Sequence, residues 1–160
     1  MERLWAPWRM SYILNSRQPG CFMCDLLQAD RDAENMILKR GETGALLLNR
    51  YPYNNGHLMA ATYRHVSDLA AMNPAERAEM TELAALACTL LRKTHRPDGF
   101  NIGINIGAAS GAGLVDHVHM HIVPRWEGDT NFMAVLGGVK VIPQPLDELW
   151  HQLCDALNSQ

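Results

Sequence analysis

The sequence predicts an α+β domain in which a central antiparallel sheet of about five strands packs against one long helix. Short apolar segments separated by turn residues fill the middle of the 160-residue chain, and one strong helical repeat interrupts them. The connections resemble hairpins more than crossover helices, which favours antiparallel pairing over a parallel βαβ arrangement. The length predicts a single domain over residues 1–160.

Apolar runs bounded by turn signals predict the strands, which we expect at residues 36–40, 45–49, 57–63, 100–107 and 116–123. The loop before the third strand is rich in Pro, Asn and Gly, residue types that form turns. We expect Pro124 to end the last strand, because proline cannot donate a backbone hydrogen bond to a neighbouring strand.

The long helix is predicted to begin after Asn73. Asn73 can cap it, Pro74 suits the first helical position, and Glu76 stands three residues after the cap, as in a capping box. Apolar residues then recur at helical spacing. Pro97 and Gly99 are expected to end the helix.

The remaining segments flank this core. Short helices are expected at residues 24–32 and 146–157. Residues 1–20 are aromatic and end in a Gln-Pro-Gly turn signal, so we interpret them as an arm packed on a core formed by residues 21–160.

The charge balance argues against several classes of partner. With 14 basic and 17 acidic residues the formal charge is −3, which does not favour the broad cationic surface that nucleic acids or membranes require. No apolar run reaches the roughly 18 residues of a membrane span. The N-terminal segment does not resemble a signal peptide. We therefore expect a cytoplasmic protein that binds neither nucleic acid nor membrane, while a small anionic ligand stays possible.

Three of the seven histidines alternate in the run His117-Val118-His119-Met120-His121. In a strand their imidazoles would share one face, about 7 Å apart, while Val118 and Met120 point into the core. Imidazole can attack phosphorus, and a neighbouring imidazole can protonate the departing oxygen. The run therefore favours phosphate-bond chemistry; the alternatives are three surface histidines and a three-histidine metal site.

A loop of small residues precedes this run. Residues 108–113 read AASGAG, so their backbone N–H groups can approach an anion closely. Taken alone such a loop is a weak signal, but it leads directly into the three histidines.

These residues together resemble the histidine triad (HIT) family of nucleotide hydrolases and transferases. The family motif, three histidines alternating with hydrophobic residues, is matched completely by residues 117–123. Residues 49–59, 63–69 and 101–107 also resemble the family. The flanks at residues 4–13 and 124–132 resemble a bacterial branch that includes diadenosine tetraphosphate phosphorylases. The resemblance implies the HIT-like fold and a homodimer whose two sheets join.

The resemblance also implies catalytic roles. His119 would attack the α-phosphorus of an AMP-containing nucleotide and form a covalent nucleotidyl-histidine, which water or phosphate then resolves. His121 and His57 would flank the phosphate. The implied substrate is a dinucleoside polyphosphate such as diadenosine tetraphosphate. A nucleoside phosphoramidase, a nucleotidyl sulfate hydrolase and a non-catalytic nucleotide-binding module held by zinc are the alternatives.

Substrate-binding positions follow from the same resemblance. Asn49 would bind the ribose hydroxyls, whereas Asn105 and the backbone from Gly111 to Gly113 would contact the phosphates. Many members carry Gln or Ser just before the triad, where this chain has Gly113 and Leu114. This departure leaves the leaving group open, and with it the choice between hydrolysis and phosphorolysis.

The sequence also contains candidate metal ligands. Cys21 and Cys24 form a CxxC pair, which by itself fits half a zinc site, a redox pair or chance. Zinc-containing members of the resembling family add a histidine after the third strand and the first histidine of the triad, here His65 and His117. The resemblance thus implies a structural zinc that ties the N-terminal segment to the sheet. His117 can serve it only from the start of its strand, where a bend re-aims the side chain.

The other cysteines and histidines are expected to play structural or surface roles. Cys88 and Cys154 are interpreted as core thiols. His95 and His151 are interpreted as surface or helix-end residues.

Overall fold

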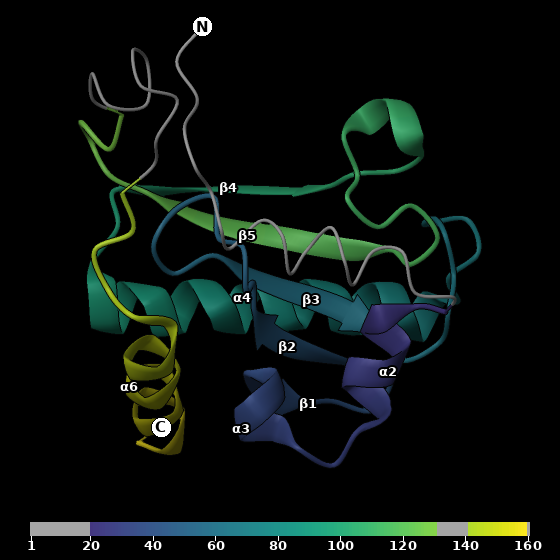
Figure 1. Cartoon of the computed structure of the whole chain (residues 1–160), viewed down its shortest axis with the longest axis horizontal. Helices are drawn as coiled ribbons and strands as arrows, with labels where there is room; N and C mark the ends of the chain where they lie inside the picture. The colour runs from purple at the N-terminus through teal and green to yellow at the C-terminus, as the bar shows by residue number, and fades with distance from the viewer. Residues whose placement is uncertain (1–19, 131–140, 160) are drawn as a thin grey trace, which may run out of the picture.

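The computed structural model describes residues 20–130 and 141–159, and the predicted arm at residues 1–20 lies outside this range except for Gly20. Its centre is the expected five-stranded antiparallel sheet, in the order β1-β2-β3-β5-β4 (Figure 1). The strands are β1 (Ile37–Arg40), β2 (Gly44–Leu48), β3 (Leu58–Thr62), β4 (Gly99–Ile104) and β5 (His119–Arg125). The helices are α2 (Phe22–Gln28), α3 (Asp32–Asn35), α4 (Pro74–His95) and α6 (Leu146–Asn158), with a short 3-10 helix η1 (Ala108–Ser110).

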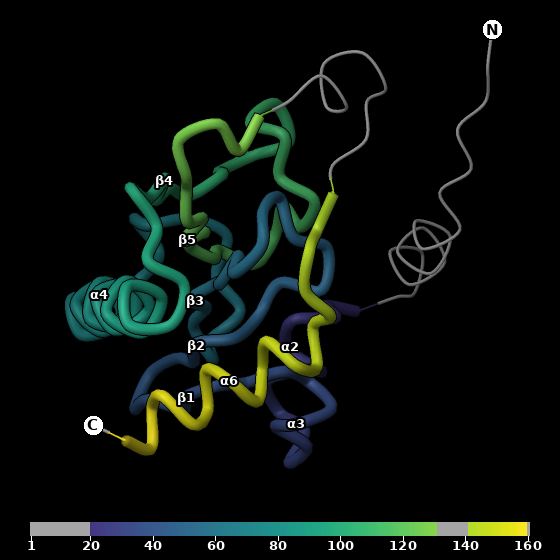
Figure 2. The backbone as a smooth tube through the Cα atoms, turned by 90° about the vertical axis from the view of Figure 1, so that its left-hand side faces the viewer, coloured from purple at the N-terminus to yellow at the C-terminus, as the bar shows by residue number. Residues whose placement is uncertain are grey.

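The two faces of the sheet carry separate apolar clusters. On one face α4 and α6 pack on residues such as Leu46, Leu58 and Ile122, and Figure 2 shows α4 end-on beside the sheet. On the other face α2 supplies Met23 and Leu27 to a smaller cluster. The candidate site lies on the second face. The smaller cluster includes Met59 and Ala61 of β3, which pair with β5.

The first predicted helix is wrong in its bounds. Residues 24–32 were expected to form one helix, whereas the chain forms α2 and then α3. The Arg40 guanidinium explains the break, since it donates to the Leu27 and Ala29 carbonyls and to the Asp32 carboxylate. These bonds satisfy carbonyls at the end of α2 that a continuing helix would have used.

The start of α4 and its end before Pro97 are both confirmed. The Asn73 side chain accepts a bond from the Glu76 N–H, and the Glu76 carboxylate accepts one from the Asn73 N–H, which completes the capping box. The helix ends at His95, and Arg96 closes it in the left-handed conformation with φ 48°. Gly99 does not cap the helix but begins β4.

The last strand was predicted at residues 116–123 and is instead His119–Arg125. Pro124 lies inside it rather than after it. The pairing of β3 with β5 stops at Leu58 and Ile122, so Pro124 has a neighbour only on the β4 side. A proline is tolerated where one side of the strand is unpaired, because no ladder hydrogen bond is lost.

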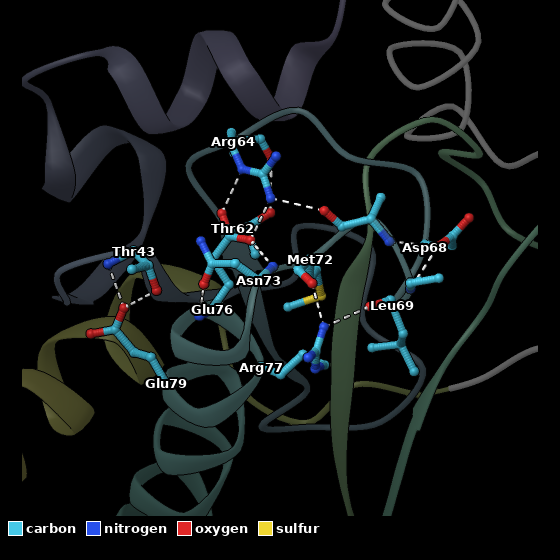
Figure 3. A network of polar contacts seen from close by, with 12 residues as sticks. Thr43, Thr62, Arg64, Asp68, Leu69, Met72, Asn73, Glu76, Arg77 and Glu79 are labelled. Carbon is cyan, nitrogen blue, oxygen red and sulfur yellow. Dashed lines mark hydrogen bonds and ion pairs between the residues drawn. The ribbon is translucent and has the colours of Figure 1, made fainter.

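The loop between β3 and α4 is held by a polar network (Figure 3). Arg64 forms an ion pair with Glu76, at 2.6 Å, and donates to the Ala71 carbonyl. Asp68 accepts from the backbone N–H groups of Ala70 and Ala71. The network fixes the loop that carries His65.

Among the described residues, no helix combines the length and the apolar character needed to cross a membrane.

Candidate functional site

The four predicted metal ligands come together from three separate segments. Cys21 and Cys24 stand at the start of α2, His65 follows β3, and His117 precedes β5. Their ligand atoms all lie within 4.8 Å of one another. Sequence spacing alone does not reveal this cluster, because Cys24 and His117 are 93 positions apart in the chain.

The spacing fits a tetrahedral ion. The His117 Nδ1 lies 3.3 Å from the Cys21 Sγ and 3.4 Å from the Cys24 Sγ, and the His65 Nδ1 lies 3.4 Å from the Cys24 Sγ. In a tetrahedral zinc site a sulfur and a nitrogen ligand lie roughly 3.5 Å apart. Two thiols and two imidazoles at these distances can therefore hold one metal ion.

The tautomer of His117 also supports a metal site. Its Nε2 lies 2.8 Å from the Thr62 carbonyl oxygen, which can only accept a hydrogen bond. The proton must therefore sit on Nε2, and the lone pair of Nδ1 faces the two cysteines. A carbonyl that orients a ligating imidazole in this way is common at metal sites.

His119 and His121 occupy the second face of the sheet at the start of β5. They pair with Ala61 and Met59 of the smaller apolar cluster, while Val118 joins the larger cluster on the opposite face. The predicted division of the run is therefore confirmed for these residues. The ring centroids lie 4.8 Å apart, closer than the 7 Å expected from strand geometry.

The ring of His117 lies toward the cysteines of α2, and its centroid is 5.4 Å from that of His65. β5 begins only at His119, so His117 joins the cluster of Cys21, Cys24 and His65 from a position just before the strand. The backbone N–H of Val118 donates to the Val66 carbonyl, at 2.7 Å, which bends this segment toward the His65 loop.

The hydrogen bonds of His119 leave one nitrogen free to react. Its Nδ1 lies 2.9 Å from the carbonyl oxygen of His117, so Nδ1 carries the proton in the neutral ring. The lone pair then resides on Nε2, as a nucleophilic imidazole requires.

His57 and His121 form a directed chain of hydrogen bonds. The Tyr53 backbone N–H donates to the His57 Nδ1, at 3.1 Å, which places the proton of neutral His57 on Nε2. That Nε2 lies 2.9 Å from the Nδ1 of His121, so His57 donates to His121. The remaining proton of His121 is therefore on Nε2, where it can donate a hydrogen bond to another group.

Burial keeps these imidazoles neutral. His57 is 0% exposed, and burial followed by the nearby charge of His121 lowers its pKa to about 3. Burial and then the charge of His119 lower the pKa of His121 to about 4. Burial also lowers the pKa of His119, although its bond to the His117 carbonyl opposes this. Neutral rings at cellular pH are what both a nucleophile and a hydrogen-bond donor of defined tautomer need.

Both polar atoms of the Asn49 side chain contact other residues of the site. Its Oδ1 accepts from the Tyr51 N–H, at 2.8 Å, and its Nδ2 lies 3.3 Å from the His57 Nδ1. The structure thus places Asn49 where it orients His57, a contact that we did not expect from the sequence.

Two adjoining hollows open beside His121. One, of about 220 Å³, is lined by His121 and Asn105 together with Tyr53, Asn101, Ile102, Gly103 and Val123. The other, of about 240 Å³, continues over Tyr53, Asn54, Asn101, Val123 and Arg125. The structure therefore brings Asn105 to the triad.

The small-residue loop between β4 and β5 projects beyond the end of the sheet (Figure 1). Gly111 ends η1 with φ 81°, a conformation that favours glycine, and Gly113 is exposed. Neither residue lines the two hollows.

Tyr53 is the residue that the sequence analysis missed. The residue is 55% exposed, and its ring centroid lies 4.6 Å from that of His57 and 5.5 Å from that of His121. Its main contribution to His57 comes from a backbone N–H, which every residue but proline has. No side-chain signal in the sequence could have identified that contribution.

The remaining predictions for cysteine and histidine agree with the structure. Cys88 is buried in the larger cluster, and Cys154 packs against it while partly buried. His95 is the last residue of α4, and His151 is an exposed residue of α6.

Comparison of the sequence with known proteins identifies a matching family and several relatives. A family profile described as the HIT domain matches residues 31–128. An AP-4-A phosphorylase of Mycobacterium tuberculosis (strain ATCC 25618 / H37Rv) is 40% identical over 155 residues, which cover 91% of this chain and 79% of the relative. An adenylylsulfatase of Arabidopsis thaliana is 28% identical over 112 residues, covering 70% of this chain and 55% of the relative.

The fold of the chain is also similar to that of a solved structure. A zinc-bound histidine triad family protein from Mycobacterium smegmatis superposes with a TM-score of 0.71 at 27% sequence identity, covering 88% of this chain and 94% of that one.

Proposed function

The chain belongs to the histidine triad (HIT) family, and on that premise we propose that it cleaves a phosphoanhydride of a dinucleoside polyphosphate through a covalent nucleotidyl-histidine. Its similarity to a relative named AP-4-A phosphorylase supports the substrate class. With diadenosine tetraphosphate, attack at the α-phosphorus releases ATP and leaves AMP on the enzyme. Water then yields AMP, or phosphate yields ADP.

The observation that carries this proposal is the tautomer of His119. Its Nδ1–H donates to the His117 carbonyl, so the Nε2 lone pair is available to attack phosphorus. As the P–N bond forms, the bond from phosphorus to the bridging oxygen breaks, and the leaving nucleotide takes the electron pair.

His121 supplies a hydrogen bond to the leaving oxygen in this scheme. Its Nε2–H lies on the face that carries His119, and the hydrogen bond from His57 to its Nδ1 fixes that tautomer. The Nε2–H of neutral His121 would donate a hydrogen bond to the departing oxygen, which leaves as a phosphate anion of ATP and needs no proton. Removing a hydrogen-bond donor aimed at developing charge typically costs roughly 10²- to 10³-fold in rate.

The substrate-binding assignments stay predictions. We propose that Asn105 contacts the phosphates, which its place beside His121 supports. Gly111 and Gly113 would add backbone N–H groups from the loop. Asn49 would contact the ribose hydroxyls while it also orients His57.

We propose that the Cys21, Cys24, His65 and His117 cluster binds zinc, supported by its geometry and by the zinc-bound relative. Four protein ligands leave no open coordination position, so the ion would be structural. It would fasten the start of α2 to the loops that flank β3 and β5.

A homodimer is proposed through β4. This strand is an edge of the sheet, and Ile102 within it and Ile106 just after it are 49% and 44% exposed. The opposite edge is covered, since the Trp150 Nε1–H donates to the Ile37 carbonyl of β1. A cytoplasmic location stays a prediction.

The decisive experiment is trapping of the intermediate. Wild-type protein mixed with diadenosine tetraphosphate labelled in the α-phosphate should acquire acid-labile label on His119. His119→Ala should acquire none and lose at least about 10³-fold in turnover, as nucleophile removal does elsewhere. His151→Ala, at an exposed histidine of α6, is the matched control and should behave as wild type.

The products separate hydrolysis from phosphorolysis. ADP that appears only when phosphate is added selects the phosphorylase activity, whereas AMP in both conditions selects hydrolysis. An adenylyl sulfate and an adenosine phosphoramidate belong in the same assay, because one relative is named an adenylylsulfatase. Unchanged turnover in His119→Ala would refute the covalent mechanism.

A further inference from the structure

We infer that the metal site orients the proposed nucleophile, with His117 as the positioning residue that links the two. The catalytic part of this inference rests on the proposed function, whereas its structural part does not. His117 offers its side chain to the metal cluster and its carbonyl to His119. A bound ion would therefore act on the tautomer and direction of the His119 ring.

Three contacts converge on the single residue His117. Its Nδ1 faces the thiols of Cys21 and Cys24, its Nε2–H donates to the Thr62 carbonyl, and its own carbonyl accepts from the His119 Nδ1. The side chain is 0% exposed. When both ring nitrogens are fixed, the ring and the peptide that follows it have one orientation.

The sheet does not supply this orientation by itself. Pairing between β3 and β5 begins at Ala61 and His119, so His117 precedes the ladder. The adjacent peptide is tied instead to the metal-site loop, because Val118 N–H donates to Val66, the residue after His65. Metal binding would hold His65 and His117 at the same ion. It would thereby hold the two segments that the Val118 to Val66 hydrogen bond joins.

Without an ion, the cysteine side of His117 has only thiol–imidazole contacts of 3.3 and 3.4 Å. A thiol is a weak hydrogen-bonding group, so these contacts restrain the ring less than coordination does. The His117 carbonyl would then sample other directions, and His119 would lose its fixed acceptor.

The pair formed by His57 and His121 provides an internal control. The Tyr53 N–H and the Asn49 side chain hold His57 from the loop before β3. Neither residue belongs to the metal cluster. Loss of the ion should therefore disturb His119 while leaving the bond between His57 and His121 in place.

The test compares imidazole nitrogens by NMR in zinc-loaded protein, in protein stripped with a chelator, and after zinc is added back. Single histidine variants assign the signals. We expect the protonated Nδ1 of His119 to be resolved with zinc, lost or averaged between tautomers without it, and restored on re-addition. The bond from His57 to His121 should persist throughout.

Kinetics supply the second readout. Stripping zinc should lower kcat by about 10- to 100-fold with little change in KM, because a misdirected nucleophile affects the transition state more than binding. Cys24→Ser should reproduce the stripped state. Cys154→Ser, a thiol on α6 outside the cluster, should leave the NMR signals and kcat unchanged.

Two results would overturn the inference. One is a stripped protein in which the His119 tautomer is unchanged. The other is a stripped protein in which the signals of His57 and His121 collapse together with those of His119, because the ion would then stabilise the whole fold rather than the nucleophile. If zinc-loaded wild type turned over no nucleotide, the proposed function would fail, but the NMR comparison would still decide the positioning role.

Discussion

The chemistry of this site depends on which nitrogen of each histidine holds a proton. Backbone groups decide this for His117, His119 and His57, through the Thr62 carbonyl, the His117 carbonyl and the Tyr53 N–H. His121 then follows from His57. In the neutral rings His119 therefore carries its proton on Nδ1, whereas the other three histidines carry it on Nε2.

The role of His57 can be tested by a pair of substitutions. His57→Leu removes the donor to His121, so kcat should fall by roughly 10²-fold, most strongly for substrates whose leaving group needs a proton. His57→Gln keeps an amide donor and should retain more activity. Steady-state rates on substrates with basic and with weakly basic leaving groups measure the difference. Equal losses in the two variants would exclude a hydrogen-bonding role for His57.

At the scale of elements, α4 organises both the fold and the metal-site loop. Its first turn receives the Arg64 ion pair through Glu76, so the helix start and the His65 loop are one structural unit (Figure 3). One turn later, the Glu79 carboxylate accepts from the backbone N–H groups of Glu42 and Thr43. The same helix thus holds the turn between β1 and β2.

Removal of the cap should weaken this unit measurably. Asn73→Ala deletes the acceptor for the Glu76 N–H and should lower the free energy of unfolding by about 1 kcal/mol. Glu82→Ala, at an exposed position of the same helix, should change it by less than about 0.5 kcal/mol. Urea unfolding measures both. Similar values for the two variants would show that the cap contributes nothing particular.

At the scale of the whole molecule, buried neutral histidines make stability depend on pH. The folded pKa values of His57 and His121, about 3 and about 4, lie below the ordinary value of 6.5. Below pH 6.5 the unfolded chain binds protons that the folded chain does not bind. The free energy of unfolding should therefore fall as the pH decreases from about 6.5 toward 4, by about 1.4 kcal/mol per pH unit for each group.

Urea unfolding between pH 7 and pH 5, with a chelator present so that metal loss does not contribute, checks this dependence. His57→Gln should show a shallower pH dependence, because one of the shifted groups is gone. A wild-type stability that is flat across this range would contradict the predicted burial of neutral rings.

Much of the molecule is determined by local sequence. The capping box at Asn73 and Glu76 fixed the start of α4, and alternation within residues 117–121 separated core positions from site positions. Local patterns also placed all five strands within a few residues. The four metal ligands were identified through family resemblance, and the structure brings them together.

Tertiary contacts decided the rest. The break between α2 and α3 depends on Arg40, and the place of Pro124 inside β5 depends on where β3 ends. The alternating histidines did not by themselves reveal that the ring of His117 contacts the cysteines while His121 lines a hollow. That division comes from carbonyls and N–H groups supplied by distant segments, which the side-chain sequence does not encode locally. The sequence therefore identified the candidate site histidines, and the folded backbone determined the proton-bearing nitrogen of each.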